Sequence, residues 1–190
     1  MTGDLLFTLH AVRLLGFAET QAVADRFNRD HSLVESELID AGVLGFVSHT
    51  SFAGSSGWSL SSAGRVENER LLAAELERED ARPAVIGVHG EFVNLNVTVV
   101  SACSAVQLQQ VTGTAASGIL EEALASWSLL EERLTGSLPR FGGYSRRLMD
   151  ALEHARRDIA WFTATDCDSF HRAWFELHED LIATLGIQRG

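Results

Sequence analysis

The fold is decided by residues 4–65, DLLFTLHAVRLLGFAETQAVADRFNRDHSLVESELIDAGVLGFVSHTSFAGSSGWSLSSAGR. The first part of this stretch carries apolar side chains at the spacing of one helix face: Leu5, Leu6, Leu9, Val12 and Leu15. Gly16 follows, and glycine commonly ends a helix. The pattern therefore predicts a first helix that ends near Leu15.

Two further helices and a strand pair follow in the same stretch. Residues 20–30 place Val23, Ala24 and Phe27 on one helix face. Residues 31–42 repeat the pattern, with these side chains expected to point inward: Leu33, Val34, Leu38 and Ile39. Strand-like runs at 43–49 and 57–60 then flank a Ser/Gly-rich tip, which predicts a β-hairpin, and Ser61 or Ser62 can cap the next helix. Three helices followed by a hairpin is the order of a winged helix-turn-helix domain.

Two segments carry a family resemblance. Residues 57–65, GWSLSSAGR, resemble the W-x-L-T-x-x-G pattern that closes the wing in MarR-like regulators. Residues 138–186 resemble the tail of a group of actinobacterial proteins with a helical C-terminal part, through Trp161-Phe162 and the run WFELHED at 174–180. The resemblance implies a cytoplasmic homodimeric transcriptional regulator. Its winged helix would bind double-stranded DNA, and its C-terminal part would bind a small molecule.

The charge distribution opposes simple DNA binding. The chain has a net charge of −11 and no lysine, and up to Asp80 six arginines stand against thirteen acids, a balance of −7. Proteins that bind DNA usually concentrate Lys and Arg where they meet phosphates. The third helix carries Glu35, Glu37 and Asp40 instead. The residues that we expect at a DNA interface are Arg26, Arg29, His31, Ser32, Ser36, His49 and Arg65.

The rest of the chain has helical patterns. Residues 63–80 are a charged linker helix, broken at Arg82-Pro83. A helix is expected next, despite many β-branched residues, because apolar positions recur every three or four residues: Val88, Phe92, Leu95, Val99, Cys103 and Val106. After a loop at 112–118, we expect a helix at 119–134, a segment from Pro139 to Trp161 and a last helix ending near Leu185. The fold class is thus mainly α, with a winged helix-turn-helix domain at 1–80 and a four-helix bundle-like ligand-binding and dimerisation domain at 84–190.

The last helix holds the candidate ligand site. Helical spacing places His171, Trp174, Phe175 and His178 on one face. Other residues of matching chemistry are Asn96, Tyr144, His154 and Trp161. The alternative is that the histidines are core residues with hydrogen-bond partners. A metal site is not expected, because His171 and His178 lie about 10.5 Å apart along a helix, and no cofactor motif is present.

Two functions therefore remain open. One is the MarR-like regulator. The other is a winged-helix protein that does not bind DNA and acts as a small-molecule binder or cofactor-free enzyme, with His171 or His178 as general base and Asp168 orienting it. A third, weaker alternative is an adaptor that docks a protein through its acidic helix. We expect no secretion signal, no membrane span and no disulfide framework, since the chain has two cysteines.

Overall fold

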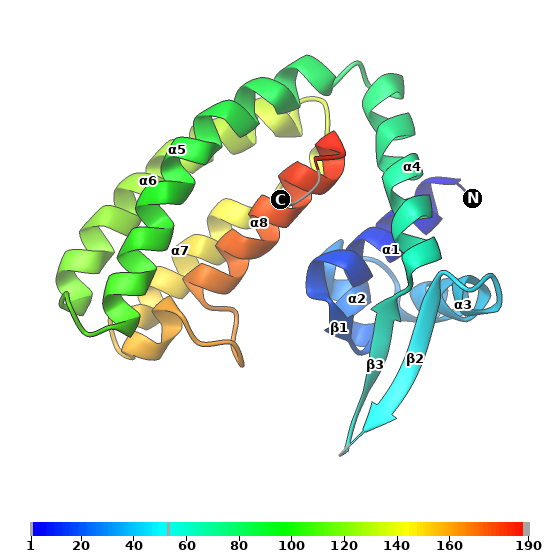
Figure 1. Ribbon diagram of the computed structural model, residues 1–190, viewed down its shortest axis with the longest axis horizontal. Coiled ribbons are helices and arrows are strands. Elements are labelled where there is room, and N and C mark those ends of the chain that lie inside the picture. The colour runs from blue at the N-terminus through cyan, green and yellow to red at the C-terminus, as the bar shows by residue number, and fades with distance from the viewer. Residues whose placement is uncertain (1, 53, 188–190) are drawn as a thin grey trace. The chain divides into compact units, whose positions relative to one another are not determined.

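The computed structural model describes residues 2–52 and 54–187, with side chains from residue 5 onward. The described chain is mainly helical and contains a small three-stranded antiparallel sheet (Figure 1). It divides into two compact units. The first contains the described residues up to Arg78 together with Gly186 and Ile187, and the second is Glu79–Leu185.

The first unit begins with helices and ends with a hairpin and a long helix. Its elements are α1 (Thr2–Leu15), β1 (Phe17–Ala18), α2 (Thr20–Arg26), α3 (His31–Val43), β2 (Val47–Phe52), β3 (Ser55–Leu60) and α4 (Ser62–Arg78). The strands lie in the order β1-β3-β2, all antiparallel. The sequence predicts the β2–β3 hairpin but not β1, because a two-residue strand has no pattern of its own. Phe17 and Ala18 become a strand only by pairing with Ser59 and Trp58.

Two helix caps and one close approach at a glycine determine how the elements of this unit meet. The carboxylate of Asp30 accepts a hydrogen bond from the backbone N–H of Leu33 at 2.9 Å and starts α3. Ser61 confirms the predicted cap of α4, because its hydroxyl accepts from the N–H of Gly64 at 3.0 Å. A Cβ at Gly64 would lie 1.9 Å from the carbonyl oxygen of Phe46, the residue before β2. Only glycine therefore fits at this position of α4.

Helices α1, α2 and α3 pack on one another, and α4 packs on α1. The prediction for α3 is partly wrong. Val34 and Leu38 are buried as expected, but Leu33 and Ile39 are about half exposed. Leu33 is adjacent to Val34 and Ile39 is adjacent to Leu38, and adjacent residues point about 100° apart around a helix axis, so only one residue of each pair faces the core. Val66 on α4 is exposed as well.

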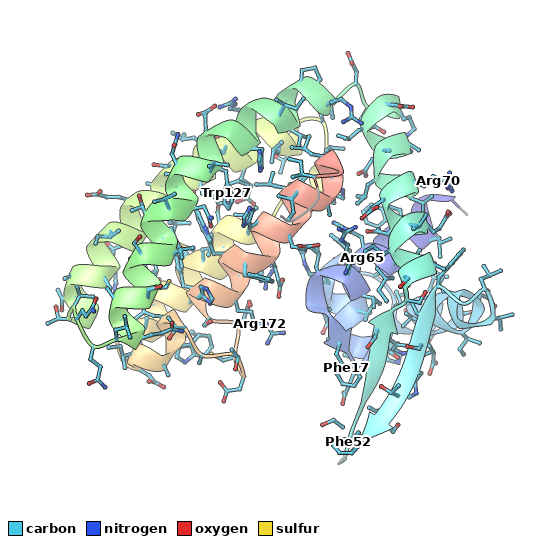
Figure 2. The ribbon with its side chains drawn as sticks, in the orientation of Figure 1. Phe17, Phe52, Arg65, Arg70, Trp127 and Arg172 are labelled. Atoms are coloured by element: carbon cyan, nitrogen blue, oxygen red, sulfur yellow. The ribbon has the colours of Figure 1, made fainter. Side chains whose placement is uncertain are left out.

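The second unit consists of long helices. Its elements are α5 (Arg82–Gln107), α6 (Gly113–Thr135), η1 (Pro139–Phe141), α7 (Tyr144–Ala155), η2 (Ile159–Phe162) and α8 (Phe170–Leu185). Helix α5 packs on α6 and α8, and α7 packs on α6 and α8. The helical assignment of α5 is confirmed, and Val88, Phe92, Val99, Cys103 and Val106 all face the core. Trp127 of α6 lies in the same core (Figure 2).

Two boundaries in this unit differ from the predicted ones. Helix α6 begins at Gly113, so most of the expected loop at 112–118 is helical, and the hydroxyl of Thr112 caps it by accepting from the N–H of Ala115. The segment from Pro139 to Trp161 is divided into η1, α7 and η2. Gly113 and Gly118 are of a residue type typical of turns, but both lie inside α6.

Helix α5 also bears on the membrane expectation. Among the described residues it is the one helix that is long and apolar enough to cross a membrane by length and composition. Only 22% of its apolar window is buried. A core helix of a soluble protein can satisfy the same criteria, so the finding is weak evidence for a span. The sequence predicts α5 as a helix but not as a candidate span, because polar residues interrupt its apolar positions.

The packing at Gly64 generates a test of the first unit. We expect Gly64→Ala to lower the free energy of unfolding by about 2 kcal/mol or more, because the new methyl group overlaps the Phe46 carbonyl. Gly42→Ala in α3 is the matched control, since a Cβ there meets its nearest atom, on Trp58, at an ordinary 3.7 Å. Urea denaturation followed by circular dichroism measures both. Equal stabilities of the two variants would contradict the close approach of α4 to Phe46.

Candidate functional site

The residues expected to meet DNA lie on α2, α3, the hairpin and α4. His31, Ser32 and Ser36 are exposed on α3, and Arg65 is exposed on α4 (Figure 2). His49 is exposed on β2, and its ring lies 4.8 Å from the ring of Trp58. Phe52 is exposed near the hairpin tip (Figure 2). These positions leave polar side chains of α3 and the hairpin in contact with solvent.

Arg29 lies elsewhere than expected. Its guanidinium donates to both carboxylate oxygens of Glu37, each at 2.7 Å, and to the hydroxyl of Thr8 at 2.7 Å. Thr8 in turn donates to Glu37. The side chains of Arg29 and Glu37 are only 12% and 16% exposed. Arg29 therefore ties α3 to α1 inside the first unit and does not project from the surface as a phosphate ligand would.

This pairing also changes the charge of the α3 surface. Glu37 is neutralised by Arg29, so the three carboxylates expected to face outward are reduced to Glu35 and Asp40, both exposed. Arg26 is partly buried, and its guanidinium carbon lies 4.7 Å from the centre of the Phe27 ring. The exposed face of α3 is consequently less acidic than the sequence indicates, but it also has fewer available arginines.

The candidate ligand residues in the second unit are divided among different places. Phe92 of α5 is the centre of one group. Its ring centroid lies 5.0 Å from that of Trp174 and 5.4 Å from that of His178. The indole N–H of Trp174 donates to the side-chain oxygen of Asn96 at 3.0 Å. The structure thus brings together Asn96, Trp174 and His178, while Phe92, which carries the contact, was predicted only as a core residue.

The remaining candidates do not join this group. Phe175 was expected on the same inward face, but it is about half exposed, because one residue of helix turns it about 100° away from Trp174. His154 and Trp161 stack on each other with centroids 4.2 Å apart. His171 is partly exposed at the start of α8. Trp174 and Phe92 are fully buried, so the aromatic group has the character of a packed core.

Tyr144 belongs to a buried ionic cluster that the sequence analysis missed. Its hydroxyl donates to Asp180 of α8 at 3.0 Å. Arg140 of η1 pairs with the same carboxylate and donates to Thr184 at 2.7 Å. The side chains of Arg140 and Asp180 are 1% and 0% exposed. Forty residues separate the pair, so no local spacing could indicate it.

A second buried carboxylate organises the start of α7. Glu131 of α6 accepts from the indole N–H of Trp127 at 3.0 Å and from the backbone N–H of Ser145 at 2.7 Å. It also accepts from the backbone N–H of Gly143 and the hydroxyl of Ser145. A carboxylate at the first turn of a helix satisfies N–H groups that lack helical partners. Glu131 is therefore a capping residue for α7.

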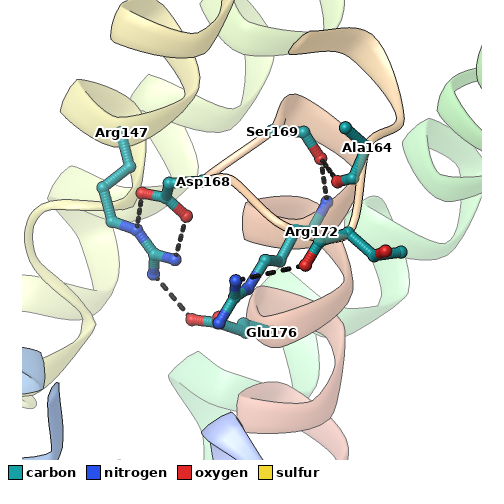
Figure 3. Close-up of polar contacts among 7 residues, drawn as sticks. Arg147, Ala164, Asp168, Ser169, Arg172 and Glu176 are labelled. Carbon is teal, nitrogen blue, oxygen red and sulfur yellow. Dashed lines mark hydrogen bonds and ion pairs between the residues drawn. The ribbon is translucent and has the colours of Figure 1, made fainter. Parts of the chain in front are cut away.

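A third cluster joins α7, α8 and the loop before α8 (Figure 3). Arg147 donates two hydrogen bonds to Asp168, at 2.9 and 2.7 Å, and forms an ion pair with Glu176 at 2.8 Å. Burial opposes the charged form, but these two carboxylates raise the pKa of the Arg147 guanidinium above its usual value. Arg172 lies 3.6 Å from the other oxygen of Glu176. Asp168 is thus engaged by Arg147, which places it in an ion pair and gives no support to a role in orienting a catalytic histidine.

A surface cavity of about 750 Å³ lies between the start of α6 and the end of α7. Its lining includes Thr114, Ser117, Arg156, Arg157 and Asp158. Arg156 pairs with Glu121, another lining residue, at 3.2 Å. None of the eight ligand residues predicted from the sequence lines this cavity, because the prediction weighted aromatic side chains and this cavity is lined by small and charged ones.

Metal and nucleophile chemistry find little support in the described part of the chain. No group of three or more His, Cys, Asp or Glu side chains there could hold a metal ion. Cys103 and Cys167 are free thiols, and burial raises the pKa of Cys103 to about 12. A thiol with so high a pKa is a poor nucleophile near neutral pH.

Comparison with known proteins gives no assignment. No protein-family model matches the chain, and no curated protein or solved structure is significantly similar to it. The function therefore has to be argued from the chain's own residues.

The Arg29 contacts generate one prediction. We expect Arg29→Ala to lower the free energy of unfolding by about 2 kcal/mol, because it leaves the largely buried Glu37 carboxylate without its cation. The double variant Arg29→Ala/Glu37→Ala should be more stable than the sum of its two single variants predicts. Denaturant unfolding measures this coupling. An unchanged stability of Arg29→Ala would show that the side chain is free for another role.

The Arg140 cluster generates a second prediction. Arg140→Met should lower the free energy of unfolding by about 3–5 kcal/mol, because the Asp180 carboxylate then stays buried without the Arg140 cation. Arg156→Met is the matched control, since its pair with Glu121 is exposed and should contribute less than about 1 kcal/mol. Similar losses in both variants would contradict a special role for the buried pair.

Proposed function

We propose that the protein is a MarR-like transcriptional regulator that binds DNA through its first unit. The observation that carries the proposal is the element order α1-β1-α2-α3-β2-β3-α4 with strands in the order β1-β3-β2. This order and pairing support a winged helix in which α2 and α3 form the helix-turn-helix and β2–β3 the wing. The packing of α5, α6, α7 and α8 likewise supports a four-helix bundle-like second unit.

The DNA-contacting residues in this proposal are those that the first unit exposes. His31, Ser32 and Ser36 would approach base edges from the start of α3. Arg65 at the start of α4 would contact phosphate, and His49 on the wing would approach the backbone. Arg29 is left out because it pairs with Glu37. With so few cations, the complex would rely on a small number of phosphate contacts and show a weak salt dependence.

The second unit would hold the regulatory small molecule. Its cavity of about 750 Å³ has the size of sites that bind small molecules. The group of Asn96, Trp174 and His178 is packed around Phe92 and lies on different helices from that cavity, α5 and α8. We therefore favour the cavity between α6 and α7 as the ligand site.

A protein partner for the first unit is the second candidate function. The same α3 surface exposes Leu33, Ile39 and Val43 beside Glu35 and Asp40. Apolar side chains mixed with carboxylates are typical of a surface that meets a protein with a basic rim. This function and DNA binding use the same helix, so one binding experiment separates them.

The experiment is a titration of DNA from upstream of the protein's own gene, followed by fluorescence anisotropy at low and moderate salt. We expect specific binding, with a slope of log K against log salt that Arg65→Ala reduces by about 1, the loss of one phosphate contact. Ser36→Glu should weaken binding at both salt concentrations, because it adds a third carboxylate to the exposed side of α3.

Arg70→Ala is the matched control. Arg70 projects from the same helix as Arg65 (Figure 2) but is paired with Glu67 at 2.7 Å, and its replacement should leave DNA affinity unchanged. Absence of binding even at low salt would reject the regulator and favour the protein-docking alternative. Equal losses in the Arg65 and Arg70 variants would reject the proposed DNA interface.

A further inference from the structure

The cavity between the start of α6 and the end of α7 has an uneven lining. The part contributed by α6 consists of small residues on one face of the helix: Gly113, Thr114, Ser117 and Gly118. The turn between α7 and η2 contributes long charged side chains, among them Arg156 and Arg157. The whole lining belongs to the second unit, so the cavity does not depend on what the first unit binds.

Gly118 leaves the α6 side of the cavity bare. It lies inside a helix of 23 residues, where glycine is less favourable than alanine. A Cβ at this position would meet no atom of the described protein within 4 Å, so close packing does not require glycine here. A larger side chain at position 118 would therefore project into open space.

The charges of the lining are unequally engaged. Glu121 pairs with Arg156 at 3.2 Å, and the carboxylate of Asp158 accepts from the backbone N–H of Ala160 at 3.0 Å. Arg157 has no hydrogen bond or ion pair from its side chain to any residue that the structure describes. Both carboxylates are thus occupied, while a guanidinium with five N–H donors and no acceptor remains available.

Two hydroxyls on α6 are available in the same way. The side chains of Thr114 and Ser117 form no hydrogen bond within the described part of the chain. Later on the same helix, the hydroxyl of Ser126 donates to the carbonyl oxygen of Glu122 at 3.0 Å, so α6 can satisfy a serine internally. The cavity therefore presents unused donors from two elements, which a ligand with several acceptor oxygens and a negative charge would match.

We propose that this cavity binds a small organic phosphate monoester. Its phosphoryl group would accept from Arg157 and from the hydroxyls of Thr114 and Ser117. A phosphate monoester presents three acceptor oxygens and a charge of about −1.5 to −2 near pH 7, whereas a carboxylate presents two oxygens and a single charge. Guanidinium groups bind phosphate through charge-assisted and often bidentate hydrogen bonds. This inference rests on the ligand site of the proposed function and names its ligand class.

The size and polarity of the cavity indicate the rest of the ligand. A volume of about 750 Å³ is much larger than a phosphate ion needs, so an organic part would be bound as well. None of the described residues that line the cavity is aromatic, so no ring there would stack on an aromatic ligand. Ala155 and Ile159 offer a small apolar area beside the hydroxyls and charges. A sugar phosphate fits this combination better than a flat apolar ring.

The first test is isothermal titration calorimetry of the whole chain, without DNA. The probes are glucose 6-phosphate, ribose 5-phosphate and glycerol 3-phosphate. We expect saturable binding of at least one of them, binding of inorganic phosphate that is about ten-fold weaker or less, and no binding of glucose. Absence of binding by all three phosphate monoesters would overturn the proposal.

The second test addresses the cation. Arg157→Gln should weaken binding of the phosphate monoester about ten-fold, because it removes a charge-assisted contact. Arg146→Gln is the matched control: Arg146 is exposed on α7, lies outside the lining and makes the same change in net charge. We expect this control to bind like the native chain. Equal affinities of the two variants would overturn the role of Arg157.

The third test addresses the place of binding. Gly118→Leu should abolish binding of the phosphate monoester with an unchanged circular dichroism spectrum, because the new side chain fills space that holds no protein atom. Gly90→Leu on α5 is the matched control, since a Cβ there also meets nothing within 4 Å and Gly90 lies outside the lining. Undiminished binding by Gly118→Leu would place the site elsewhere and overturn the proposal.

Two further arms separate the ligand class and its source. Benzoate that binds in place of phosphate monoesters, and is blocked by Gly118→Leu, would retain the cavity as a ligand site but overturn the ligand class. Phosphatidic acid carries the same phosphate monoester group on a membrane. Flotation with vesicles that contain phosphatidic acid, by a chain that binds no soluble phosphate monoester, would assign the cavity to a lipid headgroup and overturn the proposal. Loss of DNA binding alone would leave it standing, because none of these measurements includes DNA.

Discussion

Arginine buried beside a carboxylate is the interaction on which both units depend. The chain has fifteen basic side chains, and all are arginine. A buried guanidinium is costly unless its charge is paired and its N–H groups are hydrogen-bonded. Arginine meets this demand better than lysine, because its planar fork can hold two acceptors at once. Arg29 does so between α1 and α3, and Arg140 does so between η1 and α8.

The same constraint shapes what each surface can do. Pairing Arg29 with Glu37 removes one cation and one carboxylate from the surface of α3 together. What remains exposed is a set of hydroxyl and imidazole groups with Glu35 and Asp40. Net charge alone therefore overstates both the acidity and the number of available cations at this helix. It counts Glu37 and Arg29, which are already paired with each other. Specific contacts to bases depend on such local placement, while non-specific affinity depends on the available cations.

The sequence predicts features that arise from neighbours along the chain and misses those that arise between distant elements. The helices, the hairpin and the Ser61 cap follow from local spacing and were predicted. Strand β1 depends on pairing with residues forty positions away, and the Arg140–Asp180 pair spans a similar distance. For the candidate site, Trp174 and His178 were predicted together, but their shared contact, Phe92, lies on another helix. His154 and Trp161 were assigned to that group by residue type alone, and their stacking on each other shows how little residue type says about position.

Helix α5 illustrates why an apolar pattern needs a structure before it can identify the core face of a helix. Apolar residues lie on more than one face of this helix, and periodicity does not say which face is buried. Burial of Val88 and Val99, together with the hydrogen bond from Trp174 to Asn96, sets the rotation of α5 about its axis. With that rotation set, Phe92 must face the core and Val97 must face away from it. Periodicity alone does not separate these two positions, and only the packing of the other helices does.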